Sequence, residues 1–417
     1  MLSPRSIPVL APPLDREVIS AMLARTGPWA RTPGELCIAA SDHYDRILPR
    51  WAPAAENDLC QALVGALGEE SGPIAAPAWS RPGYREALPR HFSEILWLEP
   101  AAGQLDPGVD EIEEAIKAGA KAILHAPIVG NCGTLPAIQL LCREAGVLLA
   151  LDARASVGSR IHEQGPEDFG DLLLVPCDGE PTPSLLSGAV LFGCRARVSF
   201  QPRPRTTLRR SLPMALRLIA HTLRYEPRIR SLWSGPVKSA SAPHMDAEKT
   251  PRWVFAAAQA RLFQSKQRWA QRARHVRSLH LHCSHLPGSS SIDDESGALT
   301  AGAAYPLLVA DAELVSRKLQ SLGVQCVPGL AGWLAPKGMR GRRAQKIAAE
   351  AIFLPLHPFY RPEDMGFLSE AVRKAVLRSG GGVPDAPAPA LEPLPSHSGH
   401  EESDEQPLLR VVNGGAS

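Results

Sequence analysis

Short apolar runs alternate with amphipathic stretches between residues 57 and 192. Residues 57–67 have the three- and four-residue apolar spacing of a helix. The apolar runs that follow are suited to buried strands and lie at 74–77, 94–98, 122–125, 147–152, 172–175 and 189–192. Stretches with helical spacing, 110–119 and 135–146, separate some of them. This alternation predicts an α/β fold with a mostly parallel sheet that helices cover on both faces.

The second half of the chain has a different pattern. Residues 253–278 predict one long helix, and a strand at 305–309 and a helix at 312–322 follow. A last helix is expected after Asp364. Three regions result: a large domain over 1–240, a smaller α+β domain over 241–378, and a tail over 379–417. The tail is rich in Gly, Pro and Ser and then acidic, a composition typical of disorder.

Charge is distributed unevenly along the chain. The formal net charge is +2, but residues 380–417 hold six acids and one Arg, so the remainder carries about +7. Residues 195–238 contain eleven Lys or Arg and one Glu. Within them, an amphipathic basic helix over 203–230 is suited either to an anionic membrane surface or to a solvated face of the domain. No nucleic-acid partner is predicted.

Composition and cysteine usage narrow the cellular setting. Apolar residues make up 44% and charged residues 21%, as in ordinary soluble proteins. The eight Cys have no paired metal-ligand spacing, which predicts reduced, mostly buried thiols. No apolar run is long enough to span a membrane, and the first residues lack the apolar core of a signal peptide. A cytoplasmic location is expected.

Three places carry candidate chemistry. Asp152 ends a predicted parallel strand, where α/β sheets bind ligands, although such an Asp also caps turns. His280 and His282 would share one face of a strand and suit a transition metal, against the alternative of a hydrogen-bonded strand edge, and no metal is predicted. The turn 130–133 places Cys132 near the strand ends, and a structural role is expected for it.

Several segments together resemble the DegT-type (DnrJ/StrS-like) nucleotide-sugar aminotransferases. The carrying segments are 71–100, 119–159, the Phe-Gly-Asp at 169–171, and 350–372 with its Leu-Pro-Leu-His-Pro pattern. The resemblance covers residues 7–378 with gaps at 14–50 and 195–250. It implies the fold type I architecture, a dimer, pyridoxal phosphate as cofactor and a sugar nucleotide as substrate.

The resemblance also assigns roles to individual residues. Asp152 matches the carboxylate that keeps the pyridine nitrogen of the cofactor protonated. Arg154 and Ser156 stand near it, where family members carry Gln or His. Pro181 falls where the Schiff-base lysine is expected, and no Lys occurs between 122 and 237. The stretch 175–184 has no His either, which is the replacement for this lysine in the family's dehydratase relatives. Without an amine nucleophile the covalent link cannot form.

The remaining cofactor contacts are also altered. The phosphate cup, Ser-Gly-Thr at a helix N-terminus in the family, aligns with Ala55, Glu56 and Asn57. The carboxylate of Glu56 would repel a phosphate. In the segment that a dimer partner lends, only Arg252 matches. We therefore expect Asp152 to be a relic, with no catalytic residue and no bound cofactor.

Three hypotheses about function follow. The first is a non-catalytic homologue in sugar-nucleotide or polysaccharide metabolism, acting as a sugar-nucleotide binder or as a homodimer or heterodimer partner of an active paralogue. The second is a working pyridoxal-phosphate aminotransferase with a displaced lysine. The third is a membrane-surface assembly factor that uses the basic helix over 203–230.

Overall fold

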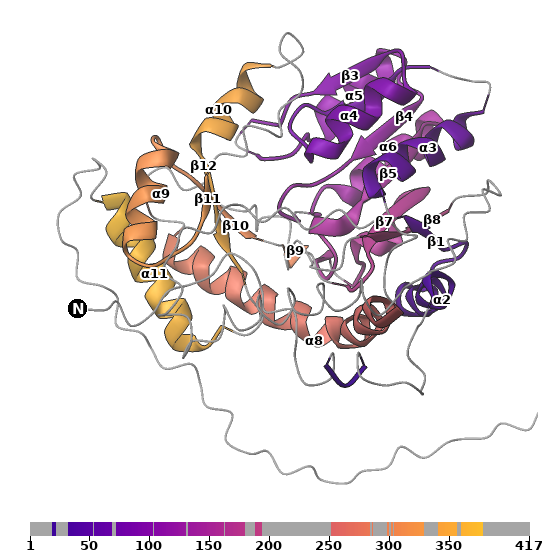
Figure 1. Cartoon of the computed structure of the whole chain (residues 1–417). Coiled ribbons are helices and arrows are strands. Elements are labelled where there is room, and N and C mark those ends of the chain that lie inside the picture. The colour runs from indigo at the N-terminus through magenta and orange to yellow at the C-terminus, as the bar shows by residue number, and fades with distance from the viewer. Residues whose placement is uncertain are drawn as a thin grey trace, which may run out of the picture. The chain divides into compact units, whose positions relative to one another are not determined.

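The computed structural model describes residues 19–21, 32–52, 54–68, 72–102, 104–130, 132–161, 163–179, 188–193, 252–283, 286, 298–299, 302, 304–328, 341–356 and 360–377. All of these residues belong to one compact unit. Within it, one large and one small sheet are each flanked by helices (Figure 1).

The large sheet has seven strands in the order β1-β8-β7-β5-β4-β2-β3. The pairs that join β3, β2, β4, β5 and β7 are parallel, whereas β8 is antiparallel to both β7 and β1. The strands are β1 (Arg50–Ala52), β2 (Ile74–Pro77), β3 (Ile95–Leu98), β4 (Ala122–His125), β5 (Leu148–Asp152), β7 (Leu172–Pro176) and β8 (Ala189–Phe192). The predicted mostly parallel sheet is confirmed.

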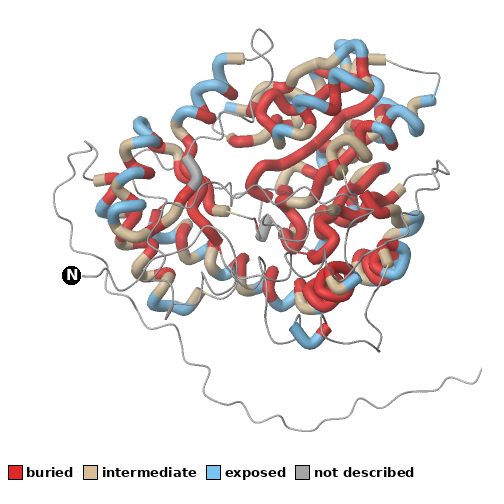
Figure 2. The backbone as a smooth tube through the Cα atoms, viewed as in Figure 1, coloured by how far each residue is buried: buried red, intermediate tan, exposed pale blue. Residues whose placement is uncertain are grey.

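Helices cover both faces of this sheet because successive strand residues point to opposite sides. On β2, Ile74 and Ala76 pack with α3 (Ala55–Leu67) and α4 (Pro82–His91). Ala75 packs with α5 (Val109–Lys117) and α6 (Leu135–Ala145). Figure 2 shows the result: the central strands are buried along their length, while the covering helices keep exposed faces.

The small sheet consists of β10 (Ala304–Leu308), β12 (Ala351–Pro355) and β11 (Val327–Pro328), with β12 antiparallel to both neighbours. Its core includes buried residues of α9 (Ala312–Ser321) and α11 (Pro362–Leu377). A two-stranded pair joins β6 (Arg160–Ile161) to β9 (Ala298–Leu299). Two further helices are α2 (Pro33–Tyr44) and α10 (Arg342–Glu350).

One helix, α8 (Arg252–Cys283), contributes to both cores. Its buried apolar residues from Val254 to Ala273 belong to the same core as α2 and one face of β7. Those from Val276 to Cys283 belong to the core of the small sheet. The predicted domain boundary at 240/241 lies outside the described residues, so the division stays a proposal.

The predicted strand through His280 and His282 is wrong, because both residues lie on α8. On a strand, Leu279 and Leu281 would share one face. Here Leu279 is fully buried while Leu281 is 66% exposed, as two residues about 200° apart on a helix must be. His280 and His282 therefore diverge, and across the described part of the chain no His, Cys, Asp or Glu residues group in a metal-binding arrangement.

The structure also bears on the expectations about the cysteines and about membrane-spanning helices. All seven cysteines in the described segments are buried free thiols, as predicted. Among the described helices, none is long and apolar enough to cross a membrane. The basic stretch 195–238, Pro181 and the tail over 379–417 lie outside the described residues.

Candidate functional site

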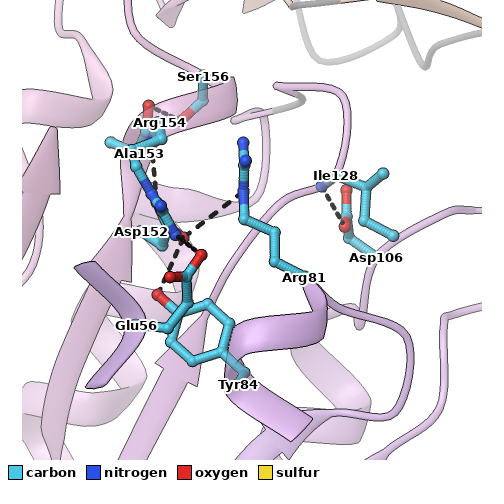
Figure 3. A network of polar contacts seen from close by, with 9 residues as sticks. All are labelled: Glu56, Arg81, Tyr84, Asp106, Ile128, Asp152, Ala153, Arg154 and Ser156. Carbon is cyan, nitrogen blue, oxygen red and sulfur yellow. Dashed lines mark hydrogen bonds and ion pairs between the residues drawn. The ribbon is translucent and has the colours of Figure 1, made fainter. Parts of the chain in front are cut away.

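A group of charged side chains around the buried Asp152 lies at the carboxyl ends of the parallel strands (Figure 3). Asp152 is the last residue of β5, and Arg154 follows in a single 3₁₀ turn, Ala153–Ala155. Arg81 and Tyr84 come from the segment after β2. Glu56 comes from the first turn of α3. The fold thus brings three elements to the place where α/β sheets bind ligands.

Asp152 accepts four hydrogen bonds. Its Oδ1 accepts from the backbone N–H of Arg154 at 3.1 Å and from Arg154 Nε at 2.9 Å. Its Oδ2 accepts from Arg154 Nη2 at 2.7 Å and from the Tyr84 hydroxyl at 2.9 Å. A carboxylate offers about four acceptor positions. The Asp152 side chain, 1% exposed, is therefore saturated by donors from the chain itself.

The local backbone explains this arrangement. Asp152 caps the 3₁₀ turn with extended φ and ψ, as Asp commonly does before a tight turn. The turn places the guanidinium of Arg154 back over the carboxylate two residues earlier, in the planar two-bond geometry that Arg makes with carboxylates. The sequence allowed two roles for Asp152, a turn cap and a site residue. In the structure Asp152 caps the turn and also lies at the centre of the candidate site.

Glu56 extends the group to α3. This helix begins at Ala55 without a side-chain cap, and Arg154 Nη2 lies 2.7 Å from Glu56 Oε1. The same nitrogen thus bridges Glu56 and Asp152. Gly83 leaves the room for this approach, since a Cβ at that position would lie 2.8 Å from the Glu56 side chain. Arg81 completes the group, with Nε 3.9 Å from Asp152 Oδ2.

The contacts set the protonation states. Burial by itself would raise the pKa of Asp152, but the charge and hydrogen bonds of Arg154 and the charge of Arg81 lower it to about 2. Burial likewise opposes ionisation of Glu56, yet Arg154 brings its pKa below the usual value. Burial and then the charge of Asp152 raise the pKa of Tyr84 well above its ordinary value. Two carboxylates and two guanidinium groups therefore balance around a neutral Tyr84.

Asp106 presents a third carboxyl group at this end of the sheet. It lies between β3 and α5, and its Oδ1 accepts the backbone N–H of Ile128 at 3.1 Å, just after β4 (Figure 3). Burial raises the pKa of Asp106 to about 7. A carboxyl group that exchanges its proton near neutral pH is suited to acid–base work or to donating a hydrogen bond.

The other residues named from the sequence lie in different surroundings. Ser156 is fully buried, and its hydroxyl donates to the carbonyl of Ala153 in its own turn. The side-chain oxygen of Asn57 lies 3.0 Å from His91 Nε2. Arg252 is exposed at the start of α8. Asp152, Arg154 and Glu56 are thus brought together. Ser156, Asn57 and Arg252 are not part of this group.

Sequence reasoning missed Arg81, Tyr84 and Asp106. A signal for the first two was present, because the Arg81-Pro82 step follows a strand and Pro marks a helix start. Residues just after a parallel strand lie at its ligand-binding end. Nothing in the spacing of Asp106 distinguishes it from other loop acids.

Residues 95–173, which include Asp106, β4, β5 and Asp152, match the model of the DegT/DnrJ/EryC1/StrS aminotransferase family. Over this segment the chain is similar to the proteins of that family. A curated relative, the dTDP-4-dehydro-2,3,6-trideoxy-D-glucose 4-aminotransferase of Saccharopolyspora spinosa, is 37% identical over 68 residues. That match spans 16% of this chain and 18% of the relative.

Solved structures extend the likeness to the whole fold. The aminotransferase TlmJ from Streptoalloteichus hindustanus is 20% identical, with a TM-score of 0.65 over 89% of this chain and 99% of that one. PseC of Helicobacter pylori, an aminotransferase involved in the biosynthesis of pseudoaminic acid, is 13% identical, with a TM-score of 0.66 over 90% and 100%. The expected fold type I aminotransferase architecture is confirmed.

The family uses pyridoxal phosphate, and the residues present here do not fit that group. A protonated pyridine nitrogen needs a free acceptor on Asp152, but that carboxylate already accepts four bonds. A phosphate at the start of α3 would meet the carboxylate of Glu56. A covalent link needs a lysine, and the sequence has none between residues 122 and 237.

Proposed function

We propose that this chain is a DegT-type homologue that uses the fold for binding and not for transamination. It acts in cytoplasmic sugar-nucleotide or polysaccharide metabolism, as a sugar-nucleotide binder or as the dimer partner of itself or of an active paralogue. The observation that carries the proposal is the saturated carboxylate of Asp152, whose four donors all come from Arg154 and Tyr84. The missing lysine supports it independently.

The absence of transaminase chemistry is tested on the purified protein. Calorimetric titration with pyridoxal phosphate and with pyridoxamine phosphate should show no binding in the micromolar range. Borohydride reduction followed by mass spectrometry should show no pyridoxyl adduct. An adduct on any lysine would support the displaced-lysine hypothesis and overturn the proposal.

The binding role is tested with sugar nucleotides. The curated relative acts on a dTDP-linked sugar, so a panel of dTDP- and UDP-sugars is the appropriate probe. Binding of one of them without turnover supports the sugar-nucleotide role. If none binds, co-purification with an active paralogue is the remaining support, and failure of both would exclude this function.

A further inference from the structure

The Arg154–Glu56 ion pair has the charge pattern of the cofactor that the family uses. The cofactor presents a cationic ring nitrogen toward a strand-end carboxylate and an anionic phosphate toward a helix N-terminus. Here a guanidinium faces Asp152 with two side-chain bonds of 2.9 and 2.7 Å, and a carboxylate occupies the first turn of α3. One nitrogen, Arg154 Nη2, joins the two charges through a 2.7 Å contact to Glu56.

Each half is explained by the same electrostatics that would hold the ligand. A carboxylate with 1% exposure needs a cationic partner, because an unpaired buried charge is strongly unfavourable. The start of α3 favours negative groups, because backbone N–H groups and the helix dipole are positive there; Ala54 offers no side-chain cap, and Asp58 accepts the Ala54 N–H at 3.0 Å. Arg154 meets the first need, and Glu56 places a further carboxylate in the first turn, where a negative group is favoured.

We propose that Arg154 and Glu56 are an internal replacement for the two charged ends of pyridoxal phosphate, so that the site is complete without any cofactor. This inference rests on the proposed function and deepens it, since it states what closes the site. It goes beyond the loss of the lysine, because a chain that had lost only that lysine would still hold the cofactor noncovalently.

Removing the pair should reopen the site. The test compares wild type, Arg154→Ala, and the double variant Glu56→Gln/Arg154→Ala, with pyridoxamine phosphate as the probe in calorimetry and thermal-shift measurements. We expect the double variant to bind at least about tenfold more tightly than wild type, the factor of one charge-assisted hydrogen bond. Pyridoxamine without the phosphate should bind the double variant more weakly.

A matched control shows whether the gain comes from the site. Adding Asp152→Asn to the double variant removes the carboxylate that would hold the ring nitrogen, so the gained affinity should be lost. A folded double variant that binds no better than wild type overturns this inference and leaves the proposed function intact. Micromolar binding to wild type would instead overturn the proposed function.

A second variant covers the case in which Arg154→Ala does not fold. Glu56 is 22% exposed and outside the apolar cores, so Glu56→Ser should fold. This variant removes the carboxylate that lies between Arg154 and the start of α3, so that an added anion can take its place. Inorganic phosphate should then raise the melting temperature of Glu56→Ser and not that of wild type. An equal response of the two proteins would refute the replacement.

Discussion

Replacing Asp152 by Asn measures how strongly the saturated carboxylate contributes to the folded state. The variant keeps the shape of the side chain but removes its charge. It also places an NH₂ group among donors, since each of the four hydrogen bonds to this carboxylate comes from an N–H or O–H. A relic with no structural role would tolerate the change, whereas the structure predicts a substantial loss of stability.

The magnitude follows from the pKa. A fall from 3.8 to about 2 corresponds to about 2.4 kcal/mol of preferential stabilisation of the ionised form. Removing one partner of a buried ion pair costs about 3–5 kcal/mol in general, but Arg154 keeps Glu56 as a second partner. We therefore expect a loss of about 2–4 kcal/mol in the free energy of unfolding at pH 7. Because the folded pKa is depressed, this contribution is complete above the unfolded value near 4 and disappears as the pH falls toward 2.

Urea unfolding of wild type and Asp152→Asn between pH 3 and pH 7 provides the measurement. The difference between the two proteins should be largest at pH 7 and shrink below pH 4. Asp42→Asn is a suitable control, because Asp42 is exposed on α2 and its replacement should cost less than about 0.5 kcal/mol. A difference below 0.5 kcal/mol for Asp152→Asn at pH 7 would show that the network does not stabilise the fold.

Three further predictions concern other parts of the chain. Asp106→Asn should gain stability relative to wild type as the pH rises from about 4 to about 7, because wild type must ionise a carboxyl group whose pKa is raised in the folded state. Unfolding measured at pH 5 and pH 8 checks the sign, and a constant difference between the two proteins would contradict it. The N–H of Ala344, in the first turn of α10, donates to the Glu99 carboxylate at 2.9 Å. Glu99→Ala should therefore lower the free energy of unfolding by about 1 kcal/mol and speed amide exchange at Ala344. Glu144 is exposed, and Glu144→Ala should do neither. A chain ending at residue 379 should melt within about 2 °C of the full chain, since the removed residues have little apolar content; a larger fall by calorimetry would mean that they pack on the rest.

The order of the elements could be predicted because each carries its own pattern. The apolar runs at β2, β4, β5 and β7 lie within a residue or two of their predicted positions, and so do α5 and α6. Buried parallel strands and amphipathic helices are encoded locally, so a single sequence shows them. The short antiparallel edge strand β1 was missed, because a three-residue strand has no period to detect.

The site was predictable only in part. Asp152 could be identified because it ends a strong strand, and Arg154 because it stands two residues later. Their bond to each other depends on the turn between them, and the contact to Glu56 joins residues 98 positions apart. No local pattern encodes such a contact. The sequence suggested that Glu56 would repel a phosphate, while the structure shows that it pairs with a cation.

The long helix α8 supplies buried side chains to the cores of both sheets. At 1.5 Å per residue, its 32 residues extend for about 48 Å. Its first part packs in one core and its last part packs in the other, and the helix is continuous between them. Unwinding α8 would therefore withdraw apolar side chains from both cores at once. We therefore expect the two cores to lose stability together, although each is a separate cluster of side chains.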